Sequence, residues 1–392
     1  MTLRTLAKYV KRKVWMVLSV FGDELVLYRW WYNFRRPKTN WDRRPKSSRS
    51  FKRTELIHSD ILISENEPRW LVVCPAWDRR PNEEWGAGQG QFFYEIVQTA
   101  LNRYGADRVT YVFIEEGETN WRNRVADAVR DSSATHVLCQ IEIDPDSSGE
   151  WTYDLLLDEL RDFWPGTFVV LLYDSVFHLH LARVDRITIR DNQCLVAAID
   201  RDVSGLYRGS APCVGPLLLP ISTESFRVLD DVVAVSANEG ARGFSFIGAL
   251  YPYRQEVIDS YRRAGIEISV NPQRTTDGRA GYGSYVSSLA ASGSTLNLAR
   301  AHVFDIPQLK CRVLEACAFK CVVFSDDELL TSSFFRPGLE FVPFTSASDL
   351  QQKLEYYRRH PHELEAIREA AFLKARELAG VSFWKCIEQA MR

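Results

Sequence analysis

The chain has 392 residues, of which 46% are hydrophobic and 26% are charged, and its formal net charge is −2. This composition excludes a largely disordered protein. The length exceeds the usual size of one hydrophobic core, so we expect two folded domains.

Cysteine usage argues against disulfides and against a structural metal. The chain has eight cysteines, most of them inside apolar runs such as LVVC and THVLC, and it contains no CxxC pair. Cys311, Cys317 and Cys321 lie close in sequence but lack the spacing of a zinc site. We therefore expect buried free thiols in a reducing compartment and no metal site.

The first 53 residues are strongly basic, with fifteen Lys and Arg against three acids. Residues 3–21 place apolar side chains at helical spacing, but the apolar run at 14–21 is too short to span a bilayer. Two interpretations stay open. The segment is either an amphipathic helix on an anionic cytoplasmic membrane surface, with residues 30–32 (WWY) at headgroup depth, or a helix packed on the domain and followed by a polar linker. Nucleic acid is disfavoured as a partner because no binding motif accompanies the charge.

Strand and helix patterns alternate from residue 69 onward. The first series has apolar strands at 69–74, 108–114, 135–143 and 167–174, with helical patterns at 90–105, 120–132 and 152–166. The second series has strands at 243–250, 266–271, 294–299 and 320–325, with helical patterns at 251–265, 281–292 and 307–319, and further helices follow to the end. Continuous apolar strands between helices indicate parallel sheets covered on both faces.

The alternation predicts an α/β protein with two doubly wound, Rossmann-like domains. We expect a basic helix and linker at 1–54, a first α/β domain at 55–235, a second at 236–380, and a last helix at 381–392 that crosses back to the first domain. Ligands of such sheets bind beyond the carboxyl ends of the strands, and in a two-domain version they bind in the cleft between the halves.

A glycine-rich loop follows the first strand. Gly86, Gly88 and Gly90 allow close backbone approach, and the helix that follows favours an anion at its N-terminus. The spacing is GxGxG, so it matches neither the dinucleotide fingerprint GxGxxG nor a Walker loop. A flexible surface turn is the alternative interpretation.

The first loop of the second series carries a second candidate anion site. Gly248 ends the strand, and Arg254 lies in the first turn of the next helix, where a cation opposes the helix dipole. That placement is favourable if Arg254 faces a phosphate, and an ordinary surface arginine is the alternative.

The segment LKCRVLEACAF places Lys310, Arg312 and Glu315 at the start of an otherwise apolar helix that we expect to begin near Pro307. Buried charges are costly unless they are paired or used. The two cations can neutralise a diphosphate, and the carboxylate can accept two hydroxyls of a ribose. The alternative is an internal ion pair between Arg312 and Glu315.

Two further polar positions belong to the interior or the end of a strand. Asn297 lies inside a strand, where a buried amide needs partners. Asp174 lies at the carboxyl end of a strand in the first series, where site residues of such sheets occur. His178 and His180 follow it, but two histidines at i,i+2 do not share a helix face, so a metal site is disfavoured there.

The motifs of residues 243–375, in their order, resemble the carboxyl-terminal half of GT-B-fold glycosyltransferases. The likeness rests on FSFIGALYPYR, STLNLAR, KCRVLEACAFKCVVFSD and FFRPGLEFVPF, and it is closest to the group-1, spore-maturation-protein-like type. The first half resembles these enzymes only in architecture and in its glycine-rich loop.

The resemblance implies a nucleotide-sugar donor bound mainly by the second domain. It assigns the ribose to Glu315 and the diphosphate to Arg254, Lys310 and Arg312, with the loop at 86–90 approaching the phosphates from the first domain. Many relatives carry two glutamates eight positions apart, whereas here Pro307 stands eight positions before Glu315. The sugar identity and the retaining stereochemistry that such a pair implies therefore do not follow.

The sequence as a whole predicts a cytoplasmic enzyme, peripheral to the membrane if the basic helix binds there. We expect a metal-independent transferase without a cofactor that moves a sugar to a glycan, lipid-linked or other surface-polysaccharide acceptor, with Asp174 as base or positioning group. A nucleotide-sugar epimerase of the same fold and a non-catalytic partner subunit are the alternatives.

Overall fold

A computed structural model describes most of the chain beyond residue 67. The described residues are 68–75, 93–114, 117–142, 152–176, 178–223, 225–226, 243–248, 250, 252–272, 274–275, 278–279, 282–301, 306–327, 329–379 and 382–392. The predictions for the basic segment at 1–53 and for Gly86, Gly88 and Gly90 lie outside these residues.

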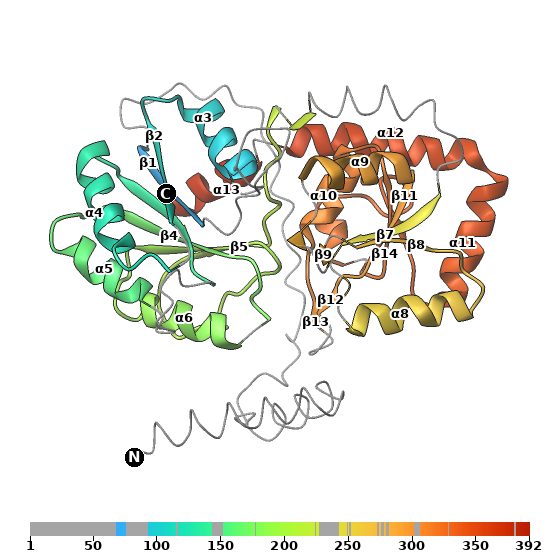
Figure 1. Cartoon of the computed structure of the whole chain (residues 1–392), viewed down its shortest axis with the longest axis horizontal. Coiled ribbons are helices and arrows are strands. Elements are labelled where there is room, and N and C mark those ends of the chain that lie inside the picture. The colour runs from blue at the N-terminus through green and yellow to red at the C-terminus, as the bar shows by residue number, and fades with distance from the viewer. Residues whose placement is uncertain are drawn as a thin grey trace, which may run out of the picture. The chain divides into compact units, whose positions relative to one another are not determined.

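The first sheet has six parallel strands in the order β2-β1-β3-β4-β5-β6. They are β1 (Trp70–Pro75), β2 (Val109–Ile114), β3 (His136–Gln140), β4 (Thr167–Leu172), β5 (Cys194–Ala198) and β6 (Cys213–Val214). The helices that accompany it are a π-helix (Phe93–Val97), α3 (Gln98–Tyr104), α4 (Trp121–Ser132), α5 (Tyr153–Arg161) and α6 (His178–Thr188). Helices cover both faces (Figure 1), which explains why β3, β4 and β5 are almost wholly apolar.

The second sheet has five parallel strands in the order β15-β14-β11-β7-β8. They are β7 (Phe244–Gly248), β8 (Ser269–Pro272), β11 (Ser294–Asn297), β14 (Val322–Ser325) and β15 (Val342–Pro343). Two short antiparallel pairs join β9 (Arg274–Thr275) to β10 (Gly278–Arg279) and β12 (Arg300–Ala301) to β13 (Ile306–Pro307). The fold class predicted from the sequence is confirmed.

Six helical segments accompany the second sheet in the part of the chain that the structure describes. They are α8 (Pro252–Arg263), α9 (Tyr282–Ser292), α10 (Cys311–Ala318), a 3-10 turn (Thr331–Ser333), α11 (Ala347–Arg359) and α12 (Pro361–Leu378), and the last helix, α13 (Ser382–Met391), follows them. No helix within the described ranges is long and apolar enough to cross a bilayer.

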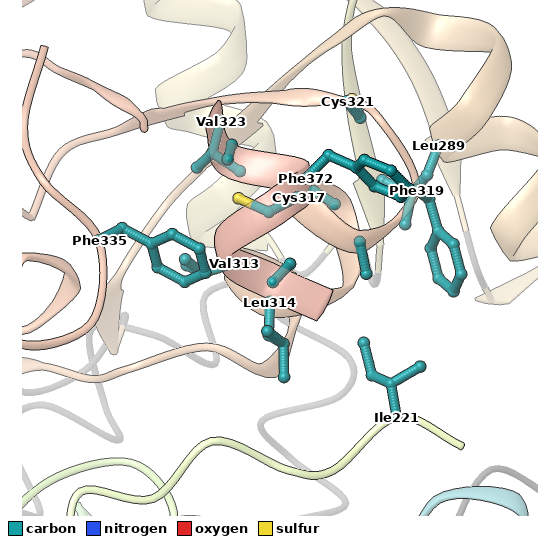
Figure 2. Close-up of a cluster of buried hydrophobic side chains, with 14 of the residues drawn as sticks. Ile221, Leu289, Val313, Leu314, Cys317, Phe319, Cys321, Val323, Phe335 and Phe372 are labelled. Atoms are coloured by element: carbon teal, nitrogen blue, oxygen red, sulfur yellow. The ribbon is translucent and has the colours of Figure 1, made fainter. Parts of the chain in front are cut away.

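Helix α10 is the buried centre of the second domain (Figure 2). Val313, Leu314 and Cys317 are almost fully buried, and they pack in one cluster with Phe335 and with Phe372 of α12. Burying a side chain of this size contributes about 1.5–3 kcal/mol, so this face fixes the position of the helix. The polar start of α10 is therefore held by its apolar remainder.

The start of α10 differs from the sequence prediction. The sequence predicted a helix beginning near Pro307, but Pro307 pairs with Arg300 in an antiparallel bridge and the helix begins at Cys311. Lys310 is the N-cap residue and has an extended backbone. The reason is that the intervening backbone bonds elsewhere: Gln308 N–H donates to the Ala299 carbonyl and Leu309 N–H to the Asp200 carbonyl.

The last helix, α13, packs in the core of the first sheet. Phe383 and Trp384 are buried in the cluster around Trp70, and the Trp384 indole N–H donates to Thr99 Oγ1 at 2.9 Å. Glu388 accepts two hydrogen bonds from the Arg103 guanidinium, at 2.8 and 2.9 Å. The chain thus returns to the first sheet after α12.

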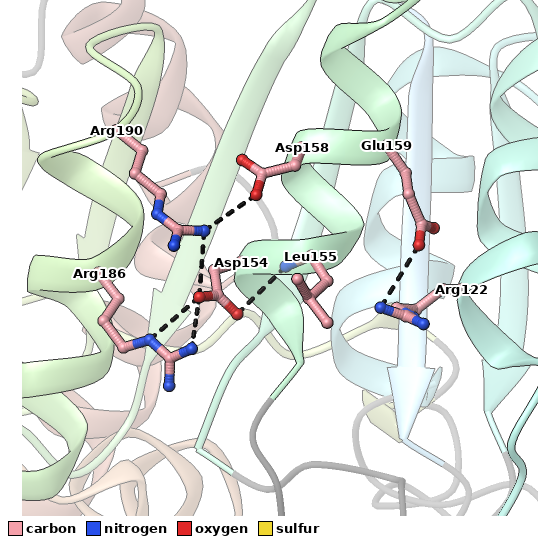
Figure 3. Close-up of polar contacts among 7 residues, drawn as sticks. All are labelled: Arg122, Asp154, Leu155, Asp158, Glu159, Arg186 and Arg190. Atoms are coloured by element: carbon pink, nitrogen blue, oxygen red, sulfur yellow. Dashed lines mark hydrogen bonds and ion pairs between the residues drawn. The ribbon is translucent and has the colours of Figure 1, made fainter.

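A buried carboxylate joins α5 to α6 (Figure 3). The Asp154 side chain is 1% exposed, and its Oδ2 lies 2.5 Å from Arg186 Nη2 and 3.2 Å from Arg190 Nη1. Its Oδ1 accepts from the Leu155 N–H. Asp158, in contrast, is 56% exposed and pairs with Arg190 alone among the described contacts.

We predict that Asp154→Ala lowers the free energy of unfolding by about 1–3 kcal/mol, because it leaves two arginines without their shared buried partner. Urea unfolding measures the change. The matched control is Asp158→Ala, for which we expect less than about 0.5 kcal/mol because exposed pairs are weak. Equal losses in the two variants would show that burial of Asp154 does not matter.

Candidate functional site

The carboxyl end of β7 requires a glycine. Gly248 has a backbone φ of 150°, and a Cβ at this position would lie 2.0 Å from Arg312 Nη2. A side chain would therefore displace the guanidinium, which lies directly against the strand end. The sequence reasoning identified Gly248 as a loop glycine, and the structure supplies the steric reason.

Two arginines from different helices lie over one buried aromatic ring. The guanidinium carbon of Arg312 is 5.3 Å from the centroid of Phe246, and that of Arg254 is 5.9 Å from the same centroid. Arg312 Nε is buried and has no hydrogen-bond partner among the described residues. The aromatic ring stabilises each of these cations only modestly.

Lys310 adds a third cation to this region. Its Nζ donates a short hydrogen bond to Gln308 Oε1. Burial lowers the pKa of Lys310 to about 8, with the charge of Asp174 opposing this shift and that of Arg254 adding to it. Lys310 therefore loses its charge at a lower pH than an exposed lysine does.

Glu315 lies one turn inside α10 and is 4% exposed. The Tyr285 hydroxyl of α9 donates to its Oε2, which fixes the orientation of the carboxylate. Burial, together with the charge of Glu315, raises the pKa of Tyr285 well above its usual value, so the phenol stays a donor. Tyr285 also lies beside Arg312, so the tyrosine links this carboxylate to one of the cations.

Asn297 ends β11 beside these groups in the second sheet. It is fully buried, and its Nδ2 donates to Ser325 Oγ at 3.0 Å. Its Oδ1 has no hydrogen-bond partner within the described ranges. The amide is thus half satisfied, which is costly in a buried place and favours a further partner.

Asp174 lies two residues beyond β4, is exposed, and accepts a 3.3 Å hydrogen bond from Gln308 Nε2 at its Oδ1. The same amide donates to Asp200 Oδ2 at 2.8 Å. His180 approaches this loop through a 2.9 Å contact between its Nδ1 and the Asp174 carbonyl oxygen. Asp174 therefore faces the segment that precedes α10.

The sequence reasoning missed three residues of this region: Glu142, Asp200 and Gln308. Burial raises the pKa of Glu142 to about 8, and the charge of Asp174 adds to the shift. Burial likewise raises the pKa of Asp200 to about 6, against hydrogen bonds from Gln308 and Ser175 that lower it. A signal was present for the two acids, because each follows an apolar strand by two residues, as Asp174 does. Nothing in the sequence marks Gln308.

The described part of the chain contains no candidate metal-binding site. No group of three or more His, Cys, Asp or Glu side chains there could hold a metal ion. His180 therefore forms no such group with the neighbouring acids.

Comparisons with known proteins found one family model that matches the sequence and several solved structures with a similar fold. The family model described as "glycosyl transferase-like" matches residues 234–391. Among solved structures, the Anabaena protein Alr3699/HepE in complex with UDP-glucose has a TM-score of 0.52 at 11% sequence identity, covering 82% of this chain and 99% of that one. The same protein in complex with UDP has a TM-score of 0.50 at 10% identity, covering 82% and 98%. No curated protein sequence is detectably similar.

At such low identity the structural likeness establishes the fold alone, and the family model matches the sequence of the second domain. Both agree with the resemblance that the motifs of residues 243–375 carry, which is thereby confirmed. Residues 234–391 match the glycosyl transferase-like family model, and the chain has the two-domain GT-B fold.

Proposed function

We propose that the chain transfers a sugar from a nucleotide-sugar donor to a glycan, a lipid-linked sugar or another surface-polysaccharide acceptor. The convergence of Arg254, Lys310 and Arg312 near the Gly248 end of β7 supports this most directly. Cations in such proximity repel one another unless an anion lies among them. The diphosphate of a nucleotide sugar supplies that charge, and the complexes of the Anabaena protein with UDP and UDP-glucose support a donor of the same kind.

In this proposal Glu315 holds the ribose. Its carboxylate is oriented by Tyr285, lies one turn beyond Lys310 and Arg312 on α10, and accepts the two ribose hydroxyls. The spacing along the helix puts the ribose next to the diphosphate that the cations bind. Gly248 and the half-satisfied Asn297 line the same edge of the sheet.

The chemistry needs charge stabilisation at the departing diphosphate and a proton acceptor at the incoming hydroxyl. The three cations stabilise the negative charge that develops as the bond to the sugar breaks, so the proposal requires no divalent metal. Asp174 takes the proton of the acceptor hydroxyl or positions that hydroxyl, because it is exposed and lies at the strand edge opposite Lys310. Membrane attachment through residues 1–53 stays a prediction.

A panel of nucleotide sugars tests the proposal. A donor at 100 times its Kd should stabilise the chain by roughly 2.7 kcal/mol in thermal unfolding. Product analysis with that donor and an acceptor should then find a transferred sugar and free nucleoside diphosphate. The proposal fails if no nucleotide sugar stabilises the chain, or if the only product is an epimerised donor.

We predict that Glu315→Ala weakens UDP binding about 10- to 100-fold, because hydrogen bonds to a charged group are worth about 1.5–3 kcal/mol. Isothermal titration calorimetry measures the Kd. The matched control is Glu340→Ala, which removes another buried carboxylate of the same domain that bonds only Arg336 in the described contacts. Unchanged UDP affinity in the Glu315 variant would refute its assignment to the ribose.

We predict that UDP affinity falls as the pH rises above about 8, by up to tenfold per pH unit, because Lys310 in the free protein then loses its proton. A bound anion raises the pKa of this lysine, so the decline levels off at higher pH. Lys310→Arg should keep its affinity at pH 9.5, since a guanidinium stays charged. A wild-type affinity that is constant between pH 7 and 9.5 would exclude Lys310 from the phosphate site.

We predict that Gly248→Ala lowers UDP affinity at least about tenfold, because the added methyl group displaces the Arg312 guanidinium that bonds the diphosphate. Gly243→Ala is the control, since a Cβ at that end of the same segment meets nothing within 4 Å. Equal affinity in the two variants would show that the position of Arg312 is not needed.

A further inference from the structure

Three acids follow three neighbouring parallel strands at the same spacing. Glu142, Asp174 and Asp200 each lie two residues beyond the last residue of β3, β4 and β5, in that order. These strands are adjacent in the sheet and run parallel, so the three acids meet at its carboxyl edge. Only the middle one, Asp174, is exposed, whereas Glu142 is 7% and Asp200 is 2% exposed.

Glu142 holds the first part of the loop that carries Asp174. Its Oε1 accepts the backbone N–H of Asp174 at 2.7 Å and also that of Tyr173. Its Oε2 accepts from Gln140 Nε2 at 2.7 Å, and Arg183 of α6 donates to its backbone carbonyl. The carboxylate is therefore fixed on both oxygens and fixes the loop in turn.

Asp200 holds the other side of the same loop. Its Oδ2 accepts the Ser175 backbone N–H at 2.9 Å and the Ser175 hydroxyl at 3.0 Å. Arg201 then binds Ser175 through its hydroxyl, at 2.7 Å, and its carbonyl, at 3.2 Å. Gln308 donates to the same Asp200 oxygen and to Asp174 Oδ1, so the held loop also contacts the segment before α10.

Two buried carboxylates around one three-residue loop are costly, and burial accordingly raises the pKa of both. In the described hydrogen bonds, the Glu142 carboxylate bonds this loop and Gln140, and the Asp200 carboxylate bonds this loop and Gln308. Their shared target is the backbone of Tyr173, Asp174 and Ser175. The free-energy cost of burying two carboxylates falls beside one exposed acid, Asp174. This arrangement favours a role for the buried pair in fixing the position of Asp174.

We propose that Glu142 and Asp200 are positioning residues for sugar transfer, which hold the backbone of residues 173–175 so that the Asp174 carboxylate faces the acceptor. This inference rests on the proposed function and deepens it. Neither residue touches the substrate. Each acts through hydrogen bonds to main-chain N–H groups, which an amide oxygen can also accept.

A double-mutant cycle tests the proposal on the full chain. The substrate is the nucleotide sugar that stabilises the chain most in the panel above, and the readout is release of nucleoside diphosphate. Glu142→Ala and Asp200→Ala should each lower kcat at least about tenfold while the donor KM changes less than about twofold. Glu142→Gln and Asp200→Asn should keep kcat within about threefold, because their carbonyl oxygens still accept the loop N–H groups.

The decisive comparison uses Asp174→Asn, which should itself lower kcat. In this background the added Glu142→Ala or Asp200→Ala should cost almost nothing further, since both act through Asp174. Asp191→Ala is the matched control: Asp191 holds Arg161 and the Gln193 N–H before β5, at the other end of the strand. It should lower stability without changing kcat. Should an alanine variant at 142 or 200 fail to fold, Ser175→Ala, which removes one donor to Asp200, enters the cycle instead.

The outcomes separate the two levels of inference. The positioning role would be overturned if Glu142→Ala or Asp200→Ala lowered kcat by the same factor in the wild-type and Asp174→Asn backgrounds. An equal loss of kcat in Asp191→Ala would overturn it as well. Neither result would contradict the proposed transferase activity. The absence of stabilisation by every nucleotide sugar would contradict the proposed function itself.

Discussion

The apolar packing of α10 is the constraint on which the polar edge of the second domain depends. Lys310, Arg312 and Glu315 stand at the start of this helix or one turn inside it, so the packing of its apolar face fixes their backbone positions. Arg254 and Arg312 lie over Phe246, whose ring is buried in the sheet, and α10 is anchored by Val313, Leu314 and the cluster around them. The apolar core thus supplies the free energy that keeps these charges in place.

The first sheet presents the opposite charge at its own carboxyl edge. Glu142, Asp174 and Asp200 lie there, and burial raises the pKa values of Glu142 and Asp200. Gln308 lies between the two sets: its amide donates to Asp174 and Asp200, and its oxygen accepts from Lys310. A neutral side chain with both donors and an acceptor can satisfy both sets, which neither an acid nor a base could do.

Sequence reasoning identified the parts of this arrangement that depend on local pattern. Strand–helix alternation predicted the two parallel sheets, and the apolar run VLEACAF predicted the buried half of α10. The strand β5, Cys194–Ala198, was missed although it is fully buried, and with it Asp200. The helix start was placed too early because Pro307 is well suited to a first helical turn, whereas here it lies in a bridge with Arg300 that only the folded chain forms. Gln308 could not be found, since its partners Asp174 and Asp200 lie more than 100 residues away.

Pro307 stands where many relatives carry a glutamate, eight positions before Glu315. Relatives that carry a glutamate eight positions before Glu315 place an acid on the segment before α10, but here that position has no carboxylate and the next residue turns its amide to the first sheet. In the proposed reaction Asp174, on the first sheet, supplies the acid that reaches the substrate, and two buried carboxylates hold its loop. Gln308 joins this loop to the segment before α10, the helix to which the proposal assigns the donor.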